Sequence, residues 1–201
     1  MQATLKMGTD LRLTRLRRLP IGTFKRESVV APTMTQERGN ESHILSSYLV
    51  FDLQSLLEAN SQGLIEPLTG ALRRNRILIP ELVIHRLDDK NKKATQTLSL
   101  GNSDEATATA KRFRDLLQFL SRNKEKDWLL LQQKGVNEDR RFFAKNNLGN
   151  DLNDVRRYVS YALFVKGNVS EKVFFVTSDP GLKRCAEDEG VLTASIGDLI
   201  A

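Results

Sequence analysis

Residues 48–52 read YLVFD, a short apolar run that ends in an aspartate. An apolar run without polar alternation is typical of a strand that is buried on both faces of a parallel sheet. Residues 172–179 (KVFFVTSD) have the same pattern, with the aspartate two residues further on. Because functional groups in parallel α/β sheets collect beyond the carboxyl ends of the strands, we expect Asp52 and Asp179 at one edge of a sheet.

The rest of the chain alternates between strand and helix patterns. Further strands are predicted at residues 76–79, 128–131 and 191–196. Apolar residues at helical spacing predict helices over 53–72, 81–87, 108–121, 151–166 and 182–189, while the polar stretch 90–107 is expected to be a surface loop and 135–149 an irregular segment. This alternation predicts an α/β fold, a three-layer sandwich in which helices cover both faces of a mostly parallel sheet.

The first 45 residues differ from the remainder. They contain eight Lys or Arg and four Asp or Glu, so they carry +4 of the chain's net charge of +6. Residues 30–42 are polar and turn-rich, as in a linker. We therefore predict a flexible basic arm over 1–45, which contacts RNA or a partner protein, and an α/β domain over 46–201. An unstructured tail and an Arg-rich transit peptide are the alternatives for the arm.

Composition limits the possible chemistry and location. The charge of +6 permits a polyanionic partner but also serves solubility, and no run approaches the roughly 18 apolar residues that a membrane span needs. The single cysteine, Cys185, excludes an internal disulfide, which fits the cytoplasm and also the nucleus. One Cys and two His cannot form a zinc cage, so any metal would be held mainly by carboxylates, which suit Mg²⁺ or Mn²⁺.

A third group of acids stands between the two strand-end aspartates. Asp151 and Asp154 open the helix predicted over 151–166. Each of these aspartates alone could simply cap a helix. Together with Asp52 and Asp179 they suggest metal-assisted phosphodiester hydrolysis, in which a carboxylate-bound cation activates water and neutralises developing charge.

The segment 48–201 resembles a PIN domain, the nuclease fold of RNA decay and processing enzymes. The resemblance is greatest to the SMG endonuclease family of nonsense-mediated mRNA decay. It is carried by four short blocks in order: YLVFDLQSLLE at 48–58, RILIPELVIHRLDD at 76–89, LGNDLNDV at 148–155 and VFFVTSDPGLKRCA at 173–186. The resemblance implies a PIN-like fold and a site of four acidic positions.

Two of those acidic positions are filled here. The first, after the first strand, matches Asp52, and the fourth, after the TS turn, matches Asp179. The family usually has Thr or Ser and then Asn after the first acid, whereas this chain has Leu53 and Gln54.

The other two positions depart from the family pattern. The second, normally a Glu, is Arg86, and the third falls on Asn153, although Asp154 or Asp151 could substitute after a small shift. The resemblance thus gives Asp52, Asp154 and Asp179 as the expected catalytic and metal-binding residues of a partly degenerate site. A guanidinium stays protonated at any relevant pH. Two unit charges ~4 Å apart, at an effective dielectric constant of ~20, interact by about 4 kcal/mol. Arg86 would therefore repel a cation, unless its side chain extends into solvent.

These features favour an RNA-associated PIN protein of mRNA surveillance whose endoribonuclease activity is weak or lost. The alternatives are an active Mg²⁺- or Mn²⁺-dependent endonuclease for single-stranded RNA and an adaptor that recruits decay factors. The expected partners are single-stranded RNA and other decay factors, among them a second PIN protomer that would complete the site. Basic residues such as Arg73, Arg74, Lys90 and Lys93 could flank an RNA path or form a solvated face.

Overall fold

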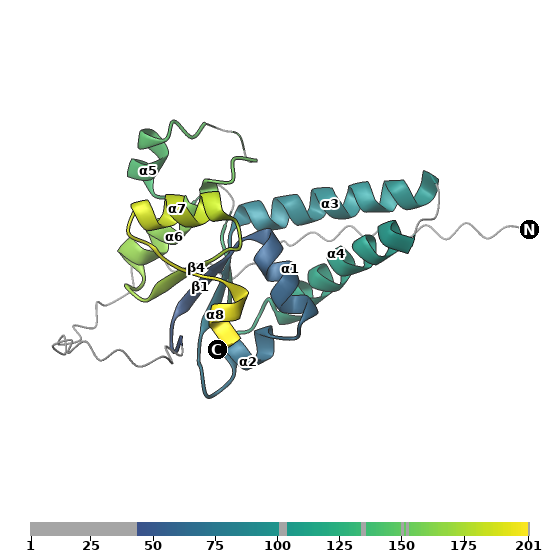
Figure 1. The fold of residues 1–201 in the computed structure, drawn as a ribbon, viewed down its shortest axis with the longest axis horizontal. Helices are drawn as coiled ribbons and strands as arrows, with labels where there is room; N and C mark the ends of the chain where they lie inside the picture. Colours follow the sequence, from purple (N-terminus) through teal and green to yellow (C-terminus); the bar gives the residue numbers. More distant parts are fainter. Residues whose placement is uncertain (1–43, 101–103, 134–135, 150, 152, 201) are drawn as a thin grey trace, which may run out of the picture.

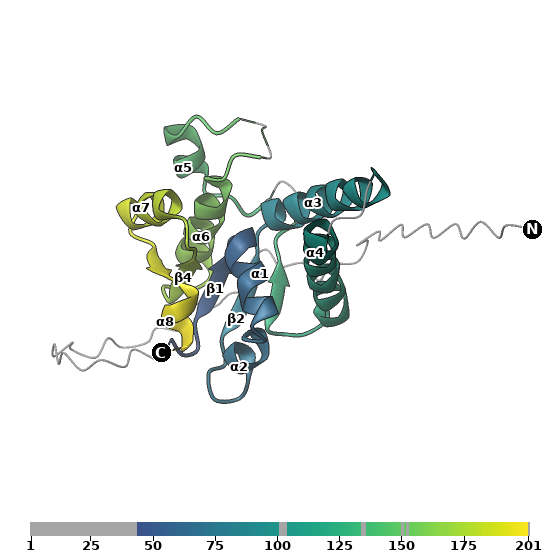
Figure 2. The same cartoon turned by 45° about the vertical axis from the view of Figure 1, so that its right-hand side comes forward.

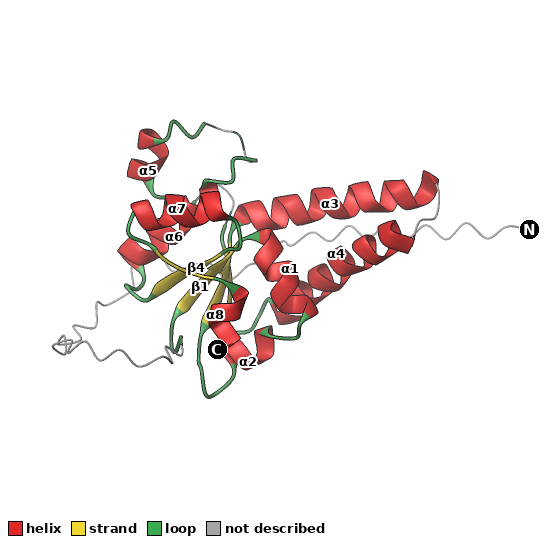
Figure 3. Ribbon diagram, viewed as in Figure 1, coloured by secondary structure: helices red, strands yellow, loops and turns green. Residues whose placement is uncertain are grey.

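The computed structural model describes residues 44–100, 104–133, 136–149, 151 and 153–200. Within these ranges five strands form one sheet in the order β3-β2-β1-β4-β5, and every neighbouring pair is parallel. The strands are β1 (Tyr48–Phe51), β2 (Arg76–Ile79), β3 (Leu129–Leu131), β4 (Val173–Val176) and β5 (Leu192–Ala194). The predicted α/β class is confirmed, and the sheet is wholly parallel (Figure 1, Figure 3).

Helices cover the sheet on two sides and make three layers (Figure 1, Figure 2). One side carries α1 (Leu53–Ser61), α2 (Ile65–Thr69), α3 (Glu81–Leu100), α4 (Asp104–Asn123) and α8 (Ile196–Ile200). The other carries α5 (Arg140–Lys145), α6 (Arg157–Asn168) and α7 (Pro180–Asp188). None of the helices in the described ranges is both long and apolar enough to cross a membrane.

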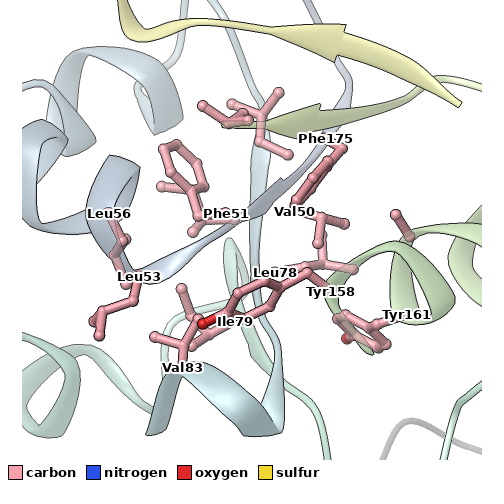
Figure 4. Close-up of a cluster of buried hydrophobic side chains, with 14 of the residues drawn as sticks. Val50, Phe51, Leu53, Leu56, Leu78, Ile79, Val83, Tyr158, Tyr161 and Phe175 are labelled. Carbon is pink, nitrogen blue, oxygen red and sulfur yellow. The ribbon is translucent and has the colours of Figure 1, made fainter. Parts of the chain in front are cut away.

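The central strands are buried because both of their faces are covered. Leu49, Val50 and Phe51 of β1 are fully buried, as their unbroken apolar run predicts. On one face of the sheet Val50 joins aromatic side chains of β4 and α6, among them Phe175 and Tyr158, whose ring centroids lie 6.4 Å apart (Figure 4). Ile44, which the sequence interpretation assigned to the arm, is also buried in this core. Residues 1–43 of the predicted arm lie outside the described residues.

The largest error of the sequence prediction concerns residues 90–107. We expected a short helix over 81–87 and then a surface loop, but α3 continues to Leu100, and α4 begins at Asp104. The polar side chains are accommodated within the helix, since the hydroxyls of Thr95 and Thr97 donate to carbonyls four residues earlier. The helix also packs against α4, so tertiary contact outweighs the loop-like composition.

The helix predicted over 151–166 begins later than expected, at Arg157. The Arg157 guanidinium lies inside the protein, where it is only 8% exposed. It donates to Glu138 Oε1 (2.6 Å) and to the backbone carbonyls of Gly149 (2.8 Å) and Asp151 (2.9 Å), and it lies 4.8 Å from the ring centroid of Phe143. These bonds hold the chain before α6 in a non-helical path.

Arg157→Ala should lower the free energy of unfolding by about 3 kcal/mol, because it leaves the partly buried Glu138 and two carbonyls without their donor. The adjacent Arg156 is more exposed and pairs with Asp154 at the surface, so Arg156→Ala should cost about 1 kcal/mol or less. Urea unfolding of both variants measures the difference. Equal losses would show that Arg157 does not anchor this segment.

Candidate functional site

The candidate site is a pocket at the carboxyl ends of β1 and β4. These strands are neighbours in the sheet although 121 residues of chain separate them, and the strand order runs outward from them in opposite directions. Such a reversal point is where open α/β sheets bind ligands. A hollow of about 540 Å³ lies there, and Asp52 and Asp179 both line it. The structure thus brings these two predicted residues together.

Asp52 is held in place by two hydrogen bonds. It is the N-cap of α1, and its Oδ1 accepts from the Ser55 amide (2.7 Å). Its Oδ2 accepts from the Thr177 hydroxyl (2.5 Å). The side chain is 4% exposed. Both carboxylate oxygens therefore already have a donor, which fixes their position at the base of the pocket.

Asp179 is the N-cap of α7 and is more exposed. Its Oδ1 accepts from the amides of Gly181 (2.8 Å) and Leu182 (2.9 Å). The Asp179 amide in turn donates to the Thr177 Oγ1 (3.1 Å). Thr177 therefore joins the two aspartates, and sequence reasoning missed this role. The signal was present in the TS pair between strand and aspartate, because a hydroxyl directly after the strand reaches the neighbouring strand end.

Arg86 of α3 is half-buried and lines the same pocket. Its Nη2 donates to the backbone carbonyl of Asn153, and its guanidinium carbon lies 6.0 Å from the ring centroid of Tyr158. The side chain is thus fixed beside the pocket and does not simply extend into solvent.

Two further cations line the pocket, and both are exposed. They are Lys90 of α3 and Arg112 of α4. On α3 the nearby acids are used elsewhere, since Asp88 pairs with Lys92 (2.6 Å) and Asp89 lies 3.5 Å from His85. Within the described ranges neither Lys90 nor Arg112 has a carboxylate partner.

The third predicted acid is not in this pocket. Asp154 binds Arg156, with its Oδ2 2.5 Å from Nη2, and neither Asp154 nor Asp151 lines the hollow. The hydrogen bond from Arg156 holds the pKa of Asp154 below its usual value. The Asp151 side chain accepts from the Asn153 amide (2.8 Å) and caps a turn. The expected roles of Asp52, Asp154 and Asp179 in catalysis and metal binding stay predictions.

A family model described as "PIN domain" matches residues 40–197. The chain belongs to the PIN domain family. Comparison with curated protein sequences gave no match. Among solved structures, the chain is similar to a domain of a functionally unknown protein from Methanocaldococcus jannaschii DSM 2661, with 16% identity and a TM-score of 0.42 over 75% of this chain and 91% of that one.

PIN domains generally use Mg²⁺ or Mn²⁺ ions and bind RNA, so the donor set of this PIN domain can be compared with that chemistry. Among the residues that the structure describes, no three His, Cys, Asp or Glu side chains are grouped so that they could hold a metal ion. The pocket contains two carboxylates, and three cationic side chains share its lining. These residues do not fit a divalent-metal centre held by the protein alone.

Tyr158 of this PIN domain has a buried hydroxyl beside the pocket. Its ring lines the hollow, its side chain is 2% exposed, and its hydroxyl is buried without a hydrogen-bond partner within the described part of the chain. Burial raises the pKa of Tyr158 to about 12, against the smaller opposing effects of the nearby Arg86 guanidinium and Leu53 amide. The hydroxyl is therefore a neutral donor throughout the physiological pH range.

Tyr158→Phe should leave the free energy of unfolding unchanged or raise it by about 1 kcal/mol, because it removes a buried polar group without a partner. Tyr48→Phe is the matched control, since the Tyr48 hydroxyl accepts from Arg76 (3.2 Å) and its loss should be slightly destabilising. Thermal and urea unfolding measure both. A marked loss for Tyr158→Phe would mean that the hydroxyl has a partner in the folded protein.

The Asp154–Arg156 pair should make stability depend on pH in acid. Because the pKa of Asp154 is lowered in the folded state, its contribution is present above the unfolded value of ~3.9 and is lost as pH falls through the folded value. Wild type should therefore exceed Asp154→Asn by about 0.5–1 kcal/mol near neutral pH. The gap should close below about pH 4. A gap of constant size across this range would contradict the pairing.

Proposed function

We propose that this PIN domain binds single-stranded RNA at the pocket between Asp52 and Asp179 and that, alone, it cleaves RNA weakly or not at all. One observation carries the proposal: the two carboxylates share the pocket with Arg86, Lys90 and Arg112. The charged lining therefore sums to +1 at neutral pH.

The charge of the lining favours an anion over a bare cation. Arginine binds phosphate oxygens through paired, charge-assisted hydrogen bonds, and lysine adds an attractive point charge. A divalent ion in the same pocket would gain from two carboxylates but would be repelled by Arg86, which is fixed by its bond to Asn153. Phosphate binding is thus the chemistry that the lining supports best.

The shape and polarity of the pocket suit a single strand. Phe113, which is half-buried, contributes aromatic surface to the lining. Proteins that bind single strands combine cationic side chains along the backbone with aromatic side chains beside the bases. A duplex would need a longer, more continuous cationic face for its two phosphate backbones.

At the narrower level we place the protein in mRNA surveillance, specifically nonsense-mediated mRNA decay in the cytoplasm. The support is the resemblance of its four sequence blocks to the SMG endonuclease family, together with the replacement of an expected Glu by Arg86. Other decay factors are then the expected protein partners. A second PIN protomer could supply the missing carboxylates, in which case mixing the two domains should raise RNA cleavage above the sum of the separate rates.

An active Mg²⁺- or Mn²⁺-dependent endonuclease is the competing function. It is favoured by the shared position of Asp52 and Asp179 at the strand ends, which keeps half of the family's acidic site. The two functions differ in what Arg86 does, since it would help RNA binding but hinder metal binding.

Arg86→Glu tests this distinction by restoring the family's acid at that position. We expect it to weaken the binding of fluorescent oligouridylate about threefold to fivefold, because it removes one charge pair between the protein and an RNA phosphate. With Mn²⁺ present, it should also raise cleavage of that RNA above the wild-type level. Arg114→Glu is the matched control, because Arg114 is exposed on α4 and does not line the pocket.

The same assays separate the alternatives. Cleavage by wild type that Asp52→Asn abolishes would establish the enzyme and overturn the binding proposal. Steeply salt-dependent binding without cleavage supports the proposal. Neither binding nor cleavage at low salt would overturn both and leave the protein-interaction adaptor.

A further inference from the structure

A second hollow adjoins the pocket on the side of α1 and α4. It measures about 600 Å³ and is lined from α1, α2 and α4. Leu57 and Arg112 line both hollows. Because they share these two side chains, the hollows are adjacent parts of one trough, with Arg112 at their junction.

We propose that this second hollow, between α1, α2 and α4, is a binding site for the bases of the RNA strand as it leaves the pocket. The inference rests on the proposed function, since it requires the strand to occupy the pocket first. It assigns a path to the strand, from Asp52 and Asp179 past Arg112 and along α4 to Arg122.

The spacing of residues on α4 supports a linear path. Arg112, Asp115, Phe119 and Arg122 recur every three or four residues and all line the second hollow. Residues at this spacing lie on one face of a helix. At 1.5 Å per residue, Arg112 and Arg122 are about 15 Å apart along the helix axis. The two arginines thus stand at opposite ends of the hollow.

The charge of the second hollow differs from that of the pocket. Arg112 and Arg122 are balanced by Asp115 and Glu66, so the charged lining sums to zero. A neutral lining does not attract a compact polyanion, but it accepts nucleobases, which are uncharged. The phosphates of the strand would then contact the arginines at the two ends.

Amide side chains give the hollow the groups that read bases. Asn60, Gln118 and Asn123 line it, and each amide offers both a donor and an acceptor. The Asn123 Nδ2 donates to the Phe119 carbonyl (2.9 Å), which leaves its Oδ1 for a ligand. Sequence-specific recognition of single-stranded RNA uses such contacts to base edges.

Phe119 provides a surface on which a base can stack. Its ring packs against Trp128 at a centroid distance of 6.2 Å, yet the side chain is only half-buried and lines the hollow. The contact with Trp128 fixes the ring, so little conformational freedom is lost when a base stacks on it. Stacking on aromatic rings is the usual source of affinity for unpaired bases.

The test compares two RNAs with the full chain by fluorescence anisotropy: a dinucleotide, which fills only the pocket, and a strand of about 12 nucleotides, which spans both hollows. Arg122→Ala should weaken the longer RNA about threefold to fivefold and leave the dinucleotide unaffected. For the longer RNA, the slope of log affinity against log salt concentration should be about 0.7 shallower in this variant than in wild type, because one phosphate contact is lost. Arg112→Ala should weaken the binding of both RNAs. Arg114→Ala, on another face of α4, should leave the binding of both unchanged.

A second measurement reports contact directly. A longer RNA that carries 4-thiouridine should crosslink to the α4 peptide around Phe119, and Phe119→Leu should reduce that crosslink while binding of the dinucleotide persists. If Arg122→Ala behaves like Arg114→Ala and no crosslink forms there, while Arg86→Glu still weakens both RNAs, the strand path is wrong and the proposed function stands. If neither RNA binds, both are wrong.

Discussion

The hydrogen bond from the Thr177 hydroxyl to the Asp52 carboxylate joins the ends of the two central strands. It connects residues 125 positions apart in the chain, and the same hydroxyl accepts from the Asp179 amide. Since Asp52 and Asp179 also cap α1 and α7, one buried polar contact fixes two strand ends and the starts of two helices. The geometry of the pocket follows from this contact. Its polar groups are buried but paired, so they lose little by leaving water.

The pocket combines two carboxylates at the strand ends with three cationic side chains. The acids come from the carboxyl edge of the sheet, and Arg86 comes from α3, at a position where the sequence resemblance predicts a Glu. Binding and cleavage make different demands on such a pocket, because attraction to phosphate improves as positive charge increases while metal retention declines. With two carboxylates and three cations, the lining is better suited to binding phosphate than to retaining a metal ion.

Sequence patterns predicted the sheet better than the helical side. The unbroken apolar runs at β1, β2 and β4 have few alternative structures, whereas the long polar end of α3 depends on packing against α4, which no local pattern reveals. For the candidate site, the strand-end rule indicated where Asp52 and Asp179 would lie, because parallel strands share an edge. The pairing of Asp154 with Arg156 could not be foreseen, since it depends on a turn that delays the start of α6. The unpaired hydroxyl of Tyr158 was equally hidden, because a tyrosine at helical spacing resembles any core residue.

The negative and the positive side chains of the pocket come from different parts of the fold. Both carboxylates stand on the rigid frame of the sheet, whereas Arg86, Lys90 and Arg112 all stand on the paired helices α3 and α4, which extend away from the sheet (Figure 1). None of these three cations belongs to the hydrophobic core, so substitutions at their positions can change the charge of the pocket without removing an apolar contact of the interior.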